Sequence, residues 1–169
     1  VGPLAPAPTQ PAHPPYRNRR ANGLSRVVCY SPRHDLSLAE LSHDAVVRLL
    51  QALQAEFRSL AEHAEVRHVL MFENRGEAVG VSNPHPHCQI YATNFVFRTI
   101  ELEAEASEVY VNEQGRVLFQ DIIAAEEAHA ERILNVSPHA LAFVPYFARY
   151  PYETFVAPTR FASLSAFFD

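Results

Sequence analysis

The stretch that most constrains this chain is residues 83–92, Asn-Pro-His-Pro-His-Cys-Gln-Ile-Tyr-Ala. In an extended strand, side chains at alternate positions point to opposite faces. One face then carries His85, His87, Gln89 and Tyr91, and the other carries Pro86, Cys88, Ile90 and Ala92. Proline has no N–H for a central ladder, so Pro84 and Pro86 predict a sheet edge or an irregular entrance to the strand. Two imidazoles and a carboxamide in a row can hold a metal, attack a phosphorus atom or bind phosphoryl oxygens.

The composition predicts a folded, soluble, cytoplasmic protein. With 169 residues, 48% of them hydrophobic, the chain is long enough for one domain with a core of its own. A formal net charge of -5 gives no basic surface for nucleic acid, and no apolar run approaches the roughly 18 to 20 residues of a membrane span. No signal peptide opens the sequence. Two cysteines, Cys29 and Cys88, are too few for a disulfide framework, so both are expected to be reduced.

Hydrophobic periodicity predicts an α+β fold, an antiparallel sheet with helices packed on it. Apolar residues recur at intervals of three and four over 42–63, which predicts an amphipathic helix capped by Ser42. A second helix is predicted over 117–131, and the acidic run in 98–112 is interpreted as a solvated helix face. The predicted strands cover residues 25–30, 67–73, 132–136, 140–144 and 154–158. The aromatic residues of 144–158 are interpreted as core and edge packing.

The histidine motif and its flanks resemble galactose-1-phosphate uridylyltransferase, the transferase branch of the histidine-triad superfamily. The resemblance rests on Phe72-Glu73-Asn74, on Gly80-Val-Ser-Asn83 and on His85-Pro-His-Cys-Gln89. The triad pattern is His-φ-His-φ-His-φ-φ, and Gln89 stands where the third histidine would be, as in the transferases. The likeness runs from Ser25 to about Asp169. It implies a histidine-triad-like nucleotidyltransferase domain at 23–169, preceded by a proline-rich arm or linker at 1–22.

The resemblance also implies an activity, the transfer of UMP from UDP-glucose to galactose 1-phosphate in the Leloir pathway of galactose metabolism. His87 would be the nucleophile of a covalent uridylyl-histidine intermediate, and Gln89 would hold the phosphoryl oxygens. Imidazole suits this role because it is substantially neutral near pH 7 and can both attack and depart. The matching substrate-binding residues are Asn74, Ser82, Gln89 and Val27.

Two metal sites are implied by the same likeness, and both are expected to be incomplete. His34 and His85 would be two of the four ligands of a structural zinc. The family's other two ligands are an upstream cysteine pair that this sequence lacks, while Cys88 points away from His85 and Cys29 lies in a strand predicted to be packed. Glu103 matches the glutamate that binds a second structural metal such as iron, whose histidine ligands would lie beyond Asp169.

The extent of the likeness leaves three readings open. The sequence corresponds to a central fragment of the family, whose full-length members are expected to be homodimers. A dinucleoside-polyphosphate or nucleotide-sugar phosphorylase also carries a His-x-His-x-Gln strand, but it takes inorganic phosphate as acceptor. A catalytically silent fragment of the transferase is the third reading.

Overall fold

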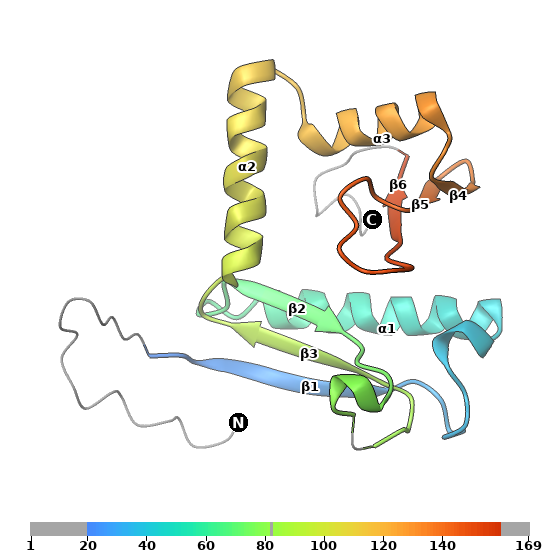
Figure 1. Cartoon of the computed structure of the whole chain (residues 1–169). Helices are drawn as coiled ribbons and strands as arrows, with labels where there is room; N and C mark the ends of the chain where they lie inside the picture. The colour runs from blue at the N-terminus through green and yellow to red at the C-terminus, as the bar shows by residue number, and fades with distance from the viewer. Residues whose placement is uncertain (1–19, 82, 160–169) are drawn as a thin grey trace. The chain divides into compact units, whose positions relative to one another are not determined.

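The computed structural model describes residues 20–81 and 83–159, and these residues divide into two compact units between Phe97 and Arg98 (Figure 1). The domain expected at 23–169 therefore comprises parts of both units, and each is described by itself. Most of the predicted arm, residues 1–19, lies outside the described residues. Within the described residues, no helix combines the length and the apolar character that a membrane span needs.

The first unit contains a three-stranded antiparallel sheet in the order β1-β3-β2. Its strands are β1 (Gly23–Cys29), β2 (His68–Phe72) and β3 (His87–Thr93). The first residue of β3, His87, pairs with Cys29 of β1, and Gln89 pairs with Phe72 of β2. The strand that carries the histidine motif is therefore central in its sheet.

One face of this sheet packs against helix α1 (His43–Ala61), which lies alongside the strands (Figure 1). Leu60 of the helix and Ile90 and Ala92 of β3 are fully buried together. The burial pattern of β3 alternates, so its even-numbered residues point into this core and its odd-numbered residues point to the opposite face. The alternation predicted from the sequence is confirmed.

Local hydrogen bonds and two 3-10 helices give structure to the segments that join these elements. Ser42 caps α1, because its side chain accepts a hydrogen bond from the Ala45 N–H at 3.3 Å, which confirms the predicted cap. A 3-10 helix, η1 (Leu38–Glu40), precedes α1, and a second one, η2 (Glu77–Val79), follows β2. Gly76 and Gly80 flank η2 with φ values of 92° and 75°, a region that favours glycine.

The second unit contains two helices and a second antiparallel sheet in the order β4-β5-β6. Its elements are α2 (Arg98–Gln114), α3 (Leu118–His129), β4 (Ile133–Val136), β5 (Ala140–Phe143) and β6 (Phe155–Pro158). Its core joins Ile123 of α3 to Leu141, Phe143 and Ala157 of the sheet. At the end of α3, the buried Glu126 accepts hydrogen bonds from Arg132 Nε at 3.0 and 3.1 Å.

The structure confirms the predicted α+β class, decides between two alternatives at the prolines and corrects one expectation. Pro84 and Pro86 precede β3, which is central in its sheet, so they mark the irregular entrance and not the sheet edge. The aromatic residues of 144–158 do not all pack: Tyr146, Tyr150 and Tyr152 are 83%, 68% and 96% exposed. Since these tyrosines lie in the connection between β5 and β6, strand periodicity does not apply to them.

Candidate active site

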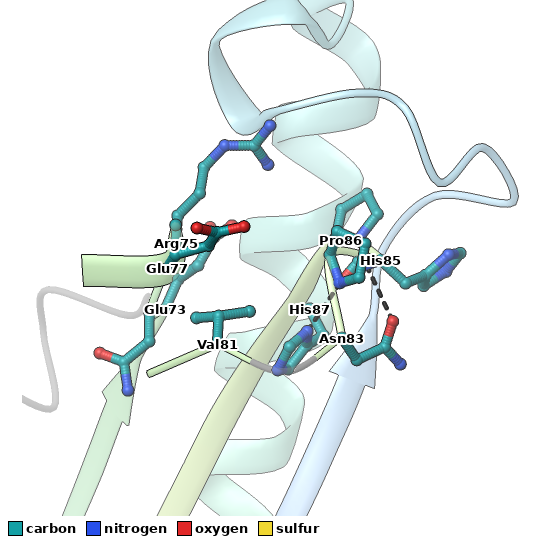
Figure 2. A pocket seen from close by; sticks show the side chains of 11 residues that line it. Glu73, Arg75, Glu77, Val81, Asn83, His85, Pro86 and His87 are labelled. Carbon is teal, nitrogen blue, oxygen red and sulfur yellow. Dashed lines mark hydrogen bonds between the residues drawn. The ribbon is translucent and has the colours of Figure 1, made fainter. Parts of the chain in front are cut away.

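A cavity of about 280 Å³ opens in the first unit where β2 ends and β3 begins. It is lined by residues 73–77, 81 and 83–87 (Figure 2). Three of the predicted site residues are among them: Asn74, His85 and His87. The lining combines the carboxylates of Glu73 and Glu77 with one guanidinium, that of Arg75. The proline-rich run before β3 thus forms part of a cavity wall.

His87 is half-buried at the start of β3, and its ring orientation is fixed by a backbone contact. Its Nδ1 lies 2.7 Å from the carbonyl oxygen of His85, as the dashed line in Figure 2 shows. A carbonyl oxygen can only accept a hydrogen bond, so this contact assigns the proton to Nδ1 of the neutral ring. Nε2 then carries the free lone pair. The arrangement places an imidazole with an available ring nitrogen on the cavity wall.

The odd-numbered residues of β3 continue this polar face away from the cavity. Gln89 is half-buried, and its Oε1 accepts a hydrogen bond from the Tyr91 hydroxyl at 3.3 Å. That contact leaves the two N–H donors of the Gln89 amide for another partner. Val27 pairs with Gln89 in the β1–β3 register and is 64% exposed. Neither Gln89 nor Val27 lines the cavity, but both share the sheet face of His87.

The turn after β2 and the loop before β3 bring two asparagines to the cavity. Asn74 follows the end of β2 and is exposed. Asn83 accepts a hydrogen bond on Oδ1 from the His85 N–H at 3.0 Å, which shapes the chain just before β3. Ser82, the remaining predicted substrate-binding residue, lies outside the described residues.

The predicted metal ligands are not brought together into a site. His34 is exposed in the segment between β1 and η1, His85 lines the cavity, and Glu103 is exposed on α2. Among residues 20–81 and 83–159, no group of three or more histidine, cysteine, aspartate or glutamate side chains could hold a metal ion. A structural zinc site needs four ligands. The described residues therefore do not fit a zinc or a second metal by themselves, and no chemical step is assigned to a metal.

Two residues with contacts at the cavity wall, Tyr30 and Arg75, were not singled out from the sequence. The hydroxyl of Tyr30 donates to Glu73 Oε1 at 2.7 Å, and burial together with that carboxylate raises the pKa of Tyr30 above its usual range. Tyr30 is 43 positions from Glu73, so no local pattern could have indicated the contact. Arg75 also donates to the Leu36 carbonyl oxygen, at 3.2 Å, across a similar separation.

The two cysteines differ in their surroundings. Cys88 is 7% exposed on the packed face of β3, and burial, reinforced by the charge of Glu73, raises its pKa to about 11. Cys29 is exposed and pairs with His87 across the sheet, so the expectation that it would be packed is wrong. It is the last residue of β1, where alternation places it on the polar face.

Comparison with known proteins identifies the family. The family described as "Galactose-1-phosphate uridyl transferase, N-terminal domain" matches residues 5–96. The galactose-1-phosphate uridylyltransferases of Haemophilus influenzae and Thermotoga maritima are 37% and 34% identical to this chain over 153 and 149 residues. These matches cover 90% and 88% of this chain but 43% and 46% of the relatives. The chain thus spans less than half the length of these curated relatives.

Solved structures agree with this assignment. One described as the structure of uridylyltransferase matches with a TM-score of 0.84 and 31% identity, and covers 94% of this chain and 50% of the other. An ADP-glucose phosphorylase from Arabidopsis thaliana with bound ADP-glucose matches with a TM-score of 0.73 and 25% identity, over 83% of this chain and 44% of the other. The chain, in which His87, Cys88 and Gln89 begin the central strand of the first unit's sheet, belongs to the galactose-1-phosphate uridyl transferase family.

Proposed function

We propose that this chain carries a uridylyl-transfer site in which His87 is the nucleophile. Nε2 of His87 attacks the α-phosphorus of UDP-glucose and forms a P–N bond, while the bond from that phosphorus to the bridging oxygen breaks and glucose 1-phosphate leaves. A phosphate oxygen of galactose 1-phosphate then attacks the same phosphorus, and the P–N bond breaks to give UDP-galactose. Two displacements through a covalent intermediate replace one difficult step.

The observation that carries this proposal is the contact from His87 Nδ1 to the His85 carbonyl oxygen, at 2.7 Å. It selects the tautomer with a free Nε2 and holds the ring against the cavity wall, so that no reorientation is needed before attack. A carbonyl acceptor also stabilises the ring N–H while the other nitrogen is bonded to phosphorus.

The negative charge of the phosphoryl oxygens requires fixed hydrogen-bond donors. Gln89 can supply its amide N–H groups, because its carbonyl oxygen is already turned toward the Tyr91 hydroxyl. Asn74 offers a second neutral amide from the cavity wall, and Ser82 stays a predicted donor. Val27 offers exposed apolar surface on the face that carries His87 and Gln89, where part of the nucleotide can lie.

The metal assignments are proposals that need ligands in addition to the residues named here. His34 and His85 are proposed zinc ligands that require two more ligands, and Glu103 is a proposed ligand of a second metal such as iron. Metal analysis of the purified chain by mass spectrometry tests both proposals. Zinc at one equivalent that is lost in a His34→Ala variant would support the first; no bound metal would contradict both. A homodimer, a cytoplasmic location and the absence of a nucleic-acid or membrane partner likewise stay predictions.

A nucleotide-sugar phosphorylase is the second candidate function, favoured by the likeness to the ADP-glucose phosphorylase structure. The first half-reaction is the same in chemical terms, but inorganic phosphate replaces galactose 1-phosphate as acceptor. The polar face of β3 does not distinguish the two, because acceptor choice depends on contacts to the second substrate.

Intact-mass spectrometry after mixing the chain with UDP-glucose tests the proposal. One added uridylyl group is expected on wild type and none on His87→Ala, while His43→Ala, which removes an exposed histidine of α1, should label like wild type. Adding galactose 1-phosphate should then discharge the label. Discharge by phosphate alone would identify a phosphorylase, and an unlabelled wild type would indicate the silent fragment.

A further inference from the structure

We propose that Tyr30 and Glu73 are positioning residues, whose hydrogen bond sets the spacing between Asn74 and His87. The inference rests on the proposed uridylyl transfer for its catalytic meaning, but its structural content can be tested without turnover. Neither Tyr30 nor Glu73 touches the reacting atoms in this proposal. Both act through the backbone on Asn74 and His87, which do.

The contacts of Tyr30 link the two sides of the cavity. Its backbone N–H donates to the carbonyl oxygen of Pro86 at 3.4 Å, and Pro86 is the residue before His87. Its hydroxyl donates to Glu73 Oε1 at 2.7 Å, and Glu73 is the residue before Asn74. A single residue therefore contacts the immediate neighbour of the proposed nucleophile and the immediate neighbour of a proposed phosphoryl ligand.

This link begins where the sheet ladder ends. The last pair of β1 and β3 on this side is Cys29 with His87, and the last pair of β2 and β3 is Phe72 with Gln89. Asn74 lies beyond both, in an exposed turn that contains residues with positive φ. Regular strand pairing cannot fix its position relative to His87. The side-chain bond of Tyr30 to Glu73 continues the connection for one more residue.

The bond has the properties of a lasting constraint. It is partly buried and joins a hydroxyl donor to a carboxylate, a pairing that is shorter and stronger than one between neutral groups. Burial and the adjacent carboxylate raise the pKa of Tyr30, so its hydroxyl keeps its proton and stays a donor throughout the neutral range. Losing the donor would leave a half-buried carboxylate without this partner, which favours movement of the Asn74 turn.

Tyr30→Phe tests the proposal because it removes one oxygen and little else. The rate of label uptake from UDP-glucose, measured over a range of concentrations, should show a maximal rate lowered about tenfold or more, since small misplacements of reacting groups are costly. The half-saturating concentration should change by less than about threefold. Glu73→Gln keeps an acceptor for Tyr30 but loses the charge of the carboxylate, so it should lower the rate less than Tyr30→Phe does.

Tyr110→Phe is the matched control. Tyr110 donates to a carboxylate oxygen of Asp121 at 2.6 Å in the second unit, so this variant loses the same kind of bond from residues that do not line the cavity. Its labelling rate should equal that of wild type. A Tyr30→Phe rate within threefold of wild type, or a Glu73→Gln loss as large as that of Tyr30→Phe, would overturn the proposal.

A second readout separates this inference from the proposed function. In NMR spectra of the folded chain without substrate, Tyr30→Phe should shift the side-chain amide signals of Asn74 and the ring signals of His87, whereas Tyr110→Phe should shift neither. Unchanged Asn74 and His87 signals overturn the positioning role even if wild type takes up label. If the signals shift but the wild-type chain takes up no label, the positioning role is upheld and only the proposed uridylyl transfer is refuted.

Discussion

The buried thiol of Cys88 provides a quantitative test of the sheet that holds His87. Cys88 directly follows His87, the proposed nucleophile, faces the opposite side of the sheet and is 7% exposed. Burial raises its pKa from 9.0 to about 11, with a further contribution from Glu73. Because the thiolate is the reactive form, a rise of this size lowers the reactive fraction about a hundredfold at neutral pH.

Alkylation with iodoacetamide, followed by peptide mass spectrometry, measures this difference. At pH 7.5 the folded chain should label Cys88 at least about a hundredfold more slowly than the urea-unfolded chain, in which the thiol has its ordinary pKa. Cys29 is the internal control, because it is exposed and its rate should change far less on unfolding. A Cys88 rate within about tenfold of the unfolded rate would show that β3 does not pack as described.

The raised pKa of Cys88 also predicts how stability depends on pH. The folded state holds the thiol proton more tightly than the unfolded state, so its contribution is fully present below about pH 9. It is lost as the pH rises from 9.0 to about 11. Wild type should therefore lose more stability across this interval than Cys88→Ser. Parallel pH profiles for the two proteins would contradict the buried thiol.

Two further predictions concern stability. Arg132→Met should destabilise the second unit by about 3–5 kcal/mol in urea unfolding, because Glu126, 3% exposed, would keep a buried charge without its partner. Arg98→Met is the control, since the ion pairs of Arg98 are exposed and should contribute less than about 1 kcal/mol. A loss above about 1 kcal/mol in Arg98→Met, or a loss below about 1 kcal/mol in Arg132→Met, argues against the buried pair. Gly23→Ala should cost about 1–3 kcal/mol, because the added Cβ would lie 2.3 Å from the Ala92 carbonyl oxygen. An unchanged melting temperature would refute that clash.

Local patterns predicted the parts of the fold that depend on neighbouring residues. Alternation along 83–92 separated the polar face of β3 from its packed face, because a strand has a side-chain period of two. The cap at Ser42 and the helix that follows were likewise visible from spacing. The position of His87 and Asn74 at one cavity could be expected only through the family resemblance.

Features that depend on distant residues could not be predicted in the same way. Strand order decides whether Pro84 and Pro86 approach an edge or a central strand, and order is a property of pairing between segments far apart. The contact of Tyr30 with Glu73 spans 43 positions. The exposure of Cys29 depends on which face of β1 packs against the rest of the unit, and the pairing of β1 with β3 sets that face.

The role of His87 is tested most directly by locating the label after reaction with UDP-glucose. The chain is digested under alkaline conditions, which preserve a P–N bond, and the modified residue is identified by tandem mass spectrometry. One uridylyl group on His87 is the predicted result. A label on His85 or on any other residue, with His87 unmodified, would contradict the assignment of the nucleophile.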